Sequence, residues 1–251
     1  MATRARLFIS PHKLGSHVVL DGADHHYLVH VLRLRTGAKV TLLDGQGQAA
    51  EAEVTEITAD RVKLVAAALE PVTQEWPRLV LLCGLLKGDK QDFVMQKATE
   101  LGAARIVPVA CERSVPQLQG ERAEHKRRRW IDIVRHAAQQ CRRADVPEVA
   151  LPQSLSEALA DAEGQKLLLY EGCAPPLGQQ LASVESGETV TMLIGPEGGL
   201  HPDEVAAAEA AGFAKVSLGP LVLRAETAVV AALAVIGYHL HSQGAPVASS
   251  R

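Results

Sequence analysis

The sequence predicts an α/β protein in which a small β-barrel domain precedes a larger domain built around a mostly parallel sheet. Up to Leu69 it contains short apolar stretches separated by turn residues, a pattern typical of strands. From Leu79 onward, apolar strands alternate with helical patterns. The segment Glu70–Pro77 separates the two regions, because it contains two prolines and has no periodicity. We therefore predict one domain at residues 1–72 and a second at residues 73–245.

The first region carries two local signals. Asp44–Gly47, with the sequence Asp-Gly-Gln-Gly, lies between two apolar runs and predicts a hairpin turn. One helix is expected to interrupt the strands at about Asp24–Leu34, with Asp24 as its N-cap. Both signals are compatible with a small barrel.

Five apolar strands are expected in the second region, at Leu79–Leu86, Arg105–Ala110, Lys166–Tyr170, Val190–Ile194 and Lys215–Leu218. Helices fill the intervals, including one that reaches Leu101 and a long one that ends near Arg143. In parallel sheets, ligands bind beyond the carboxyl ends of the strands. Functional residues are therefore expected where strands end, at Glu171, Gly195 and Gly219.

The most apolar part of the chain is its last helix, expected from Ala225 to about His241. Because this helix is apolar almost all round, it should be buried, either in its own domain or against a second subunit. Its longest apolar run, Ala228–Ile236, is far shorter than the roughly 20 residues that span a bilayer. The first ten residues do not resemble a signal peptide. We therefore expect a cytoplasmic protein that makes no membrane contact.

The cysteines and histidines do not indicate a metal site. Each cysteine is about 30 residues from the next, which is too far for a zinc or redox motif. They are Cys83, Cys111, Cys141 and Cys173, and we expect them to be small core residues. His26 and His30 are four residues apart on the expected helix, but no third ligand is apparent.

A net charge of −3 conceals two basic regions. Residues 1–39 contain six Lys or Arg and two acids, and residues 113–143 contain nine Lys or Arg and three acids. Such regions on an acidic chain are typical of localised phosphate contacts. In the second, Arg128, Arg135 and Arg142 recur every seven residues and are expected to line one stripe of a helix. The alternative is a solvated helix face.

A glycine-rich segment, Leu193–Leu200, follows one expected strand and precedes a helix that starts near His201. Its three glycines allow the backbone to approach a ligand closely, with N–H groups directed at it. The segment matches neither the Walker phosphate loop nor the Gly-x-Gly-x-x-Gly dinucleotide motif. A tight turn with no ligand remains the alternative.

A second segment, Ser217–Ala228, again reads as a strand, a Gly-Pro turn and a helix, with Arg224 and Glu226 at the start of the helix. This pair could form an ion pair that stabilises the turn. However, both segments and Tyr170–Glu171 lie at strand ends, so we predict one composite pocket.

Ile194–Gly199 and Leu218–Ala228 closely resemble the ribosomal RNA small subunit methyltransferase E family, the 16S rRNA (uracil-N3)-methyltransferases of the SPOUT superfamily. The resemblance covers nearly the whole chain. Further motifs follow in the family's order, at Arg6–Phe8, His30–Arg33, Asp44–Gly47, Lys97–Gly102, Glu112–Ser114 and Gln140–Arg143, with Pro147. Arg142 is one departure, since many relatives carry a small residue there.

The resemblance implies a PUA-like β-barrel domain followed by a SPOUT methyltransferase domain whose C-terminal chain forms a trefoil knot. It also implies a homodimer that uses S-adenosyl-L-methionine and acts on 16S rRNA of the small ribosomal subunit. The implied cofactor-binding residues are Leu169, Tyr170, Glu171, Ile194, Gly195, Pro196, Glu197, Gly198, Leu218, Gly219 and Leu223. Together with the basic regions, this leads us to expect RNA binding by Arg6, His30, Arg33, Arg113, Arg128, Arg135 and Arg143.

Methylation of uracil N3 requires loss of its proton and stabilisation of the anionic base. A guanidinium near O2 or O4 would provide the stabilisation, so Arg224 is the first catalytic candidate and Arg143 the second. Glu171 or Glu226 would accept the proton.

Two rival functions stay open. The first is an enzyme of the same architecture that modifies another RNA site, such as a ribose hydroxyl or a transfer RNA. The second is a non-catalytic RNA-binding assembly factor. The intact Gly-Pro-Glu-Gly-Gly sequence favours an enzyme, because a binding module has no need of it. Whether the substrate is naked RNA or an assembled subunit is also open.

Overall fold

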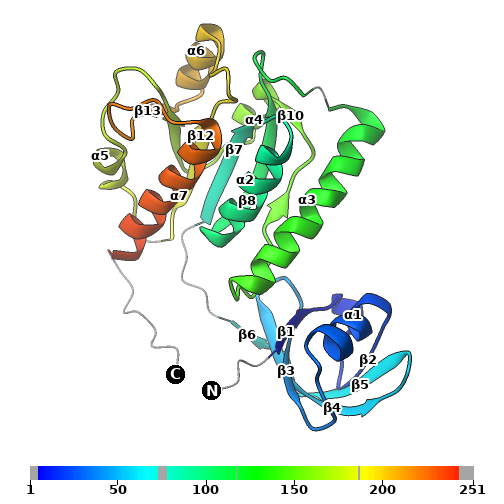
Figure 1. The fold of residues 1–251 in the computed structure, drawn as a ribbon. Helices are drawn as coiled ribbons and strands as arrows, with labels where there is room; N and C mark the ends of the chain where they lie inside the picture. The colour runs from blue at the N-terminus through cyan, green and yellow to red at the C-terminus, as the bar shows by residue number, and fades with distance from the viewer. Residues whose placement is uncertain (1–4, 73–77, 117, 186, 243–251) are drawn as a thin grey trace. The chain divides into compact units, whose positions relative to one another are not determined.

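The structure is a computed structural model that describes residues 5–72, 78–116, 118–185 and 187–242 (Figure 1). The chain divides into two compact units. The first comprises Met1–Gln74 and Ala138–Val146, and the second comprises Glu75–Ala137 and Pro147–Arg251. The segment Ala138–Val146 thus belongs with the N-terminal part of the chain, although it is distant from it in sequence.

The first unit is built on a six-stranded sheet with the order β1-β3-β4-β5-β2 and with β6 paired to β4. Its strands are β1 (Ala5–Phe8), β2 (His17–Asp21), β3 (Lys39–Leu43), β4 (Gln48–Ile57), β5 (Arg61–Ala66) and β6 (Glu70–Pro71). The pair β1–β3 is parallel and the other pairs are antiparallel. In β5 every second residue, Val62, Leu64 and Ala66, is buried, as expected for a strand with one face on the core.

The predicted hairpin turn is confirmed between β3 and β4. Asp44 Oδ1 accepts the backbone N–H groups of Gln46 at 2.7 Å and Gln48 at 2.9 Å. Gly45 and Gly47 adopt positive φ angles of 76° and 96°, which glycine reaches without strain. The turn chemistry that the sequence shows therefore directs the chain reversal.

The predicted helix in this unit differs from the one observed. After the short 3-10 turn η1 (Pro11–Lys13), the chain forms α1 (Gly22–His26), which continues as the π-helical turn η2 (Tyr27–Val31). The N-cap is Asp21 rather than Asp24. The reason is that β2 runs directly into the helix through Gly22, whose φ of 56° permits the abrupt change of direction.

The second unit contains a seven-stranded sheet in which every pair is parallel, as the sequence predicts. The order is β10-β8-β7-β12-β11-β13, with β9 paired to β8. The strands are β7 (Arg78–Gly84), β8 (Ala103–Ala110), β9 (Glu148–Val149), β10 (Gln153–Ser154), β11 (Gln165–Leu169), β12 (Thr189–Ile194) and β13 (Ala214–Val216). The α/β fold class is therefore confirmed.

Helices cover both faces of this sheet (Figure 1). The helices are α2 (Asp89–Glu100), α3 (Gly120–Gln140), α4 (Leu155–Ala160), α5 (Leu177–Leu181), α6 (Pro202–Ala210) and α7 (Ala225–Ser242). On one face α7 contacts α2, α5 and β12, and on the other α4 contacts α6 and β8. Side chains of α4 and α6, including Leu159 and Ala208, share a core with Leu82 and Leu193 of the sheet.

One expectation about the helices needs correction, and the expected burial of the last helix is met only in part within a single chain. The long helix α3 ends at Gln140, so Arg142 is not part of its arginine stripe; Arg142 adopts a left-handed φ of 64° beyond the helix end. The last helix buries Val229, Leu233 and Ile236, but Tyr238 is 79% exposed. In a single chain, α7 is thus covered only in part, because the domain provides one apolar surface for it.

The cysteines also differ from expectation. Cys83 and Cys111 are buried, but Cys141 is half-buried and Cys173, in the loop after β11, is exposed. Burial raises the pKa of the Cys111 thiol to about 12 and raises the pKa of Cys83 further. None of the described helices is both long enough and apolar enough to cross a membrane.

Candidate functional site

A cavity of about 250 Å³ opens at the carboxyl edge of the parallel sheet in the second unit. Its walls come from the segments that follow β11, β12 and β13, together with the start of α7. The lining residues include Leu169, Tyr170, Glu171, Ile194, Gly195, Pro196, Glu197, Leu218, Gly219, Leu223 and Arg224. The three segments that the sequence placed at strand ends therefore meet in one cavity.

Gly198 is the single residue of the implied cofactor set that does not line the cavity. Its carbonyl instead accepts a hydrogen bond from Arg113 Nη1 at 3.1 Å. The cavity thus unites ten of the eleven implied cofactor residues, while their role in binding stays a prediction.

Close contacts hold the glycine-rich loop, Gly195–Leu200, in shape. Pro196 lies so near Gly84 at the end of β7 that a Cβ on Gly84 would overlap its nitrogen and approach its Cδ to 2.6 Å. Gly199 turns the chain with a φ of 69° and donates to the carbonyl of Pro196 at 2.9 Å. A backbone packed this closely presents a rigid wall to the cavity.

Lys90, at the start of α2, lines the cavity but was missed by the sequence analysis. Its ammonium lies 3.3 Å from Glu197 Oε1 and 3.6 Å from Glu226 Oε2. The signal was available, because Lys87–Lys90 follows the first strand of the sheet and so lies at the same edge as the glycine-rich loop.

The pKa of Glu197 depends on both its burial and its neighbours at this edge of the sheet. Burial alone would raise the pKa of Glu197, but the backbone N–H of Lys87 at 3.1 Å and the ammonium of Lys90 outweigh it, so the pKa lies below its ordinary value. The carboxylate therefore stays ionised at neutral pH and fastens the loop to the segment after β7.

Three of the four catalytic candidates lie at or beside the cavity. Arg224 and Glu171 line it and are exposed. Glu226 lies in the first turn of α7. Its Oε2 is buried with no hydrogen-bond partner among the described residues and has Lys90 as an ion-pair partner. The fourth candidate, Arg143, belongs to the first unit, whereas the cavity lies wholly in the second.

Arg143 is part of a polar cluster in the first unit. Its guanidinium binds both carboxylate oxygens of Asp145, with Nη2 2.7 Å from Oδ2. Its carbonyl accepts from Arg6 Nη2 at 3.4 Å, and Gln139 Nε2 donates to the Arg6 carbonyl at 2.6 Å. Burial and the nearby Arg142 lower the pKa of Arg6. Two implied RNA-binding residues are thus neighbours in space.

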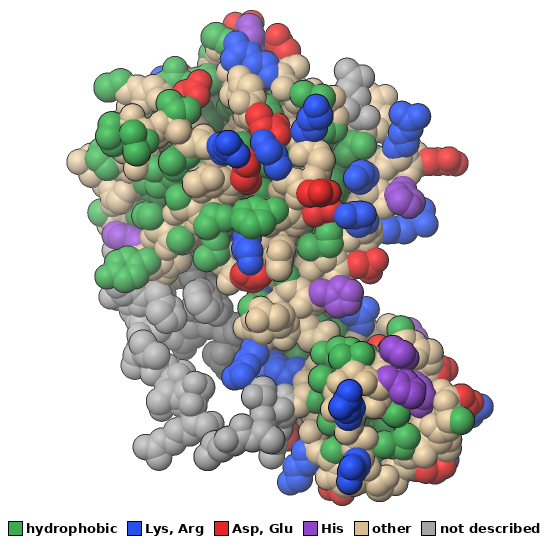
Figure 2. All heavy atoms as spheres, viewed as in Figure 1, with side chains coloured by type: hydrophobic (Ala, Val, Ile, Leu, Met, Phe, Trp, Pro, Cys, Tyr) green, Lys and Arg blue, Asp and Glu red, His purple; other side chains and the backbone are tan. Residues whose placement is uncertain are grey.

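The other implied RNA-binding residues occupy separate surfaces. His30, in η2, and Arg33, just after it, are exposed. The rings of His26 and His30 have centres 5.0 Å apart. Figure 2 shows histidine side chains gathered on one face of this unit. Arg128 and Arg135 are exposed on α3. Among the described residues, no group of three or more His, Cys, Asp or Glu could hold a metal ion.

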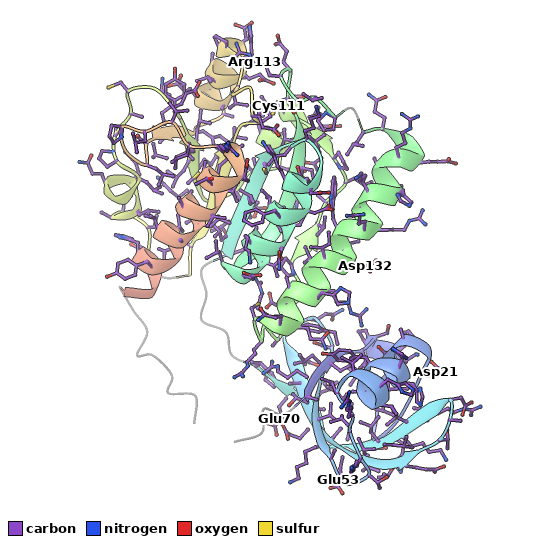
Figure 3. The ribbon with its side chains drawn as sticks, in the orientation of Figure 1. Asp21, Glu53, Glu70, Cys111, Arg113 and Asp132 are labelled. Atoms are coloured by element: carbon purple, nitrogen blue, oxygen red, sulfur yellow. The ribbon has the colours of Figure 1, made fainter. Side chains whose placement is uncertain are left out.

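Arg113 differs from the rest of this set. Figure 3 shows it with Cys111 beyond the end of β8, close to α6. Its Nη1 donates to the carbonyls of Gly198 and Leu200. No local pattern in the sequence indicates that this arginine contacts the glycine-rich loop.

Comparison with known proteins gives two family matches. A family described as RNA methyltransferase domain matches residues 74–237, and one described as RNA methyltransferase PUA domain matches residues 20–66. The second match confirms the expectation of a PUA-like domain before the α/β domain.

Individual relatives agree with these matches. Ribosomal RNA small subunit methyltransferase E of Mycobacterium bovis is 34% identical over 89% of this chain and 87% of its own, and that of Bacillus subtilis is 31% identical over 87% and 89%. The crystal structure of the Neisseria gonorrhoeae enzyme of the same name, bound to S-adenosyl methionine, is similar with a TM-score of 0.82 and 31% identity over 94% of this chain and 98% of that one.

Proposed function

Because this chain belongs to the ribosomal RNA small subunit methyltransferase E family, we propose that it transfers a methyl group from S-adenosylmethionine to N3 of a uridine in 16S rRNA of the small subunit. The observation that carries this proposal is the single cavity in which three loops meet at the carboxyl edge of the sheet. We further propose that the chain acts as a homodimer in the cytoplasm and that its C-terminal part is knotted. We also propose that its domains are residues 1–72 and 73–245, with the segment Ala138–Val146 of the second belonging to the first compact unit.

The residues of the cavity fit this cofactor. Leu169, Leu218 and Leu223 provide apolar surface for an adenine ring. Gly195 and Gly219 leave backbone groups accessible, because they have no side chains. Glu171 and Glu197 place negative charge near a cationic ligand. When bound, S-adenosylmethionine supplies a methyl group that its positive sulfur makes electrophilic.

The chain's own groups would prepare the base for attack. Arg224 would donate to O2 or O4 of uracil and stabilise the negative charge that develops as N3 loses its proton. Glu171 or Glu226 would accept that proton. The bidentate pairing of Arg143 with Asp145 favours Arg224 as the stabilising guanidinium.

RNA binding would fall to basic groups of both units, all of them exposed except the half-buried Arg6. Arg6, His30 and Arg33 in the first unit, and Arg128 and Arg135 on α3, would contact phosphates. Such contacts would also offset the few kcal/mol needed to draw a base from its stack.

One experiment tests the reaction and the base together. The purified protein is incubated with labelled S-adenosylmethionine and small subunits that lack the modification, and the digested RNA is analysed by mass spectrometry. We expect 3-methyluridine. Naked 16S rRNA that also lacks the modification is tested in parallel, and this comparison shows whether the substrate is free RNA or the assembled subunit. A different methylated nucleoside would support RNA methyltransferase activity but contradict uracil N3 as the site of methylation. Cofactor binding with no transfer would favour the non-catalytic assembly factor.

A further inference from the structure

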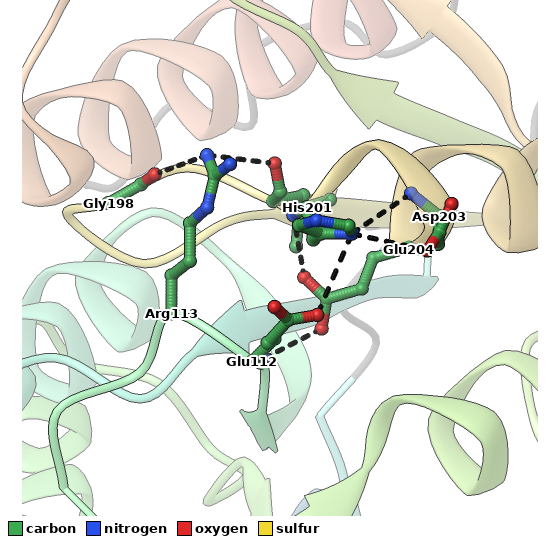
Figure 4. A network of polar contacts seen from close by, with 7 residues as sticks. Glu112, Arg113, Gly198, His201, Asp203 and Glu204 are labelled. Carbon is green, nitrogen blue, oxygen red and sulfur yellow. Dashed lines mark hydrogen bonds and ion pairs between the residues drawn. The ribbon is translucent and has the colours of Figure 1, made fainter.

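One arginine connects the glycine-rich loop to the segment after β8 (Figure 4). Arg113 Nη1 donates to the carbonyl of Gly198 at 3.1 Å and to that of Leu200 at 3.4 Å. These two carbonyls lie on either side of Gly199, where the chain turns. A single charged group therefore binds both ends of the turn, and hydrogen bonds from charged donors are stronger than neutral ones.

One carboxylate makes a second connection between the same segments. Glu204 Oε2 accepts the N–H of His201, which forms an ordinary capping box at the start of α6. Its other oxygen, Oε1, accepts the N–H of Glu112 at 2.8 Å. A capping box does not need this second bond. Glu204 thus joins the end of the loop to the residue next to Arg113.

The contact between Arg113 and the loop is also tight. A Cβ on Gly198 would lie 3.0 Å from Arg113 Cβ, so the arginine stem fills the space beside this glycine. Gly198 and Arg113 do not line the cavity, whereas Gly195, Pro196 and Gly199 do. Arg113 can therefore act on a ligand only through the loop.

From this geometry we infer that Arg113 and Glu204 are positioning residues that hold the glycine-rich loop in its ligand-binding shape. This assigns Arg113 to the loop rather than to RNA. The inference rests on the proposed function only for the identity of the ligand, S-adenosylmethionine. A loop held before binding loses less conformational freedom when the ligand arrives, which raises affinity.

The main test measures cofactor affinity by calorimetry in Arg113→Met, with Arg78→Met as the matched control. Arg78 is an exposed arginine of the same unit that pairs with Glu163. We expect Arg113→Met to weaken S-adenosylmethionine binding about tenfold. The control should bind like the wild type. With saturating cofactor, kcat and the Kd for RNA should change less than about threefold in Arg113→Met, since the loop still closes around a bound ligand.

Two further variants separate positioning from charge. Arg113→Lys keeps the charge but lacks the planar fork, so it should restore only part of the affinity. Glu204→Gln replaces one acceptor oxygen with a donor that faces an N–H group, so it should also weaken cofactor binding. Both variants change exposed or half-exposed side chains, and thermal unfolding confirms that each is folded.

Hydrogen exchange tests the same inference without any ligand. The amide of Gly199, which donates to Pro196, should exchange faster in Arg113→Met than in Arg78→Met. Unchanged exchange overturns the inference, and so does an Arg113→Met protein that keeps its cofactor affinity but loses RNA affinity. A wild-type protein that binds no S-adenosylmethionine would refute the proposed function instead, and faster exchange at Gly199 would still support the positioning role.

Discussion

Two loops that line the same cavity are held in different ways. The glycine-rich loop, Gly195–Leu200, is bound to the ends of β7 and β8 through Glu197, Arg113 and the close approach of Gly84. The loop after β13, Ser217–Arg224, has its described hydrogen bonds near its beginning, at Ser217 and Gly219, and at its end, at Arg224. Between them, Leu221 is 78% exposed and Val222 is 73% exposed.

The difference suggests that the two loops have different roles, one in cofactor binding and the other in binding of the base. A wall with many tertiary contacts keeps its shape before any ligand binds, which suits a cofactor of constant structure. A wall with exposed apolar side chains and few contacts opens at low energetic cost, which suits a base that must be drawn in from RNA. Substitutions in each loop test whether the two loops differ in this way.

The largest effect is expected at Arg224, on the exposed wall. Arg224→Ala should lower kcat by about 10²–10³-fold, because the charge on the uracil oxygen loses its guanidinium donor. Cofactor affinity, measured by calorimetry, should stay within a factor of about three. A loss of only a few-fold in turnover would exclude Arg224 as the stabilising group.

The next largest effect is expected at Gly84, which packs against Pro196 of the glycine-rich loop. The added methyl group of Gly84→Ala would overlap Pro196, and we expect it to destabilise the protein by about 3 kcal/mol in chemical denaturation. Gly178→Ala in α5 is the control, since a Cβ there meets nothing within 4 Å and alanine favours the helix. Equal stability of the two variants would show that the loop moves freely.

The exposed apolar pair should affect substrate binding without affecting stability. The double change Leu221→Ser and Val222→Ser should alter the free energy of unfolding by less than about 0.5 kcal/mol, because both side chains are largely in solvent. It should raise the KM for RNA about fivefold, the equivalent of roughly 1 kcal/mol of lost apolar contact. Leu151→Ser, at another exposed leucine, should leave KM unchanged. A double variant with the same KM as the wild type would show that these two side chains of the loop after β13 do not contribute to RNA binding.

The smallest effect is expected in the pH dependence of stability that Glu197 causes. The pKa of Glu197 is lowered in the folded protein, so its contribution to stability is complete above the ordinary glutamate pKa of about 4.3 and is lost as pH falls through the lower folded value. The stability difference between wild type and Glu197→Gln should therefore be constant from about pH 5 to 7 and narrow below about pH 4. Thermal unfolding across this range measures it, and a constant difference at every pH would show that Glu197 does not fasten the loop as a carboxylate.

The sequence by itself determined the alternation of strands and helices and the positions where strands end. All five strands expected in the second region are present, as β7, β8, β11, β12 and β13, with ends shifted by at most two residues. The short strands β9 and β10 were not expected. Two residues are too few to show a periodicity, and only pairing with β8 makes them strands.

Strand ends were informative because every parallel strand delivers its carboxyl end to the same edge, so the motif residues of three segments had to converge there. What tertiary structure alone decided is which side chain meets which backbone group at that edge. Arg113 bonds a carbonyl 85 residues away, and Lys90 joins Glu197 to Glu226. Within the other unit, Arg6 bonds the carbonyl of Arg143, 137 residues away. Charge and spacing mark such residues as polar and exposed, but their partners depend on contacts between distant segments, which local periodicity does not encode.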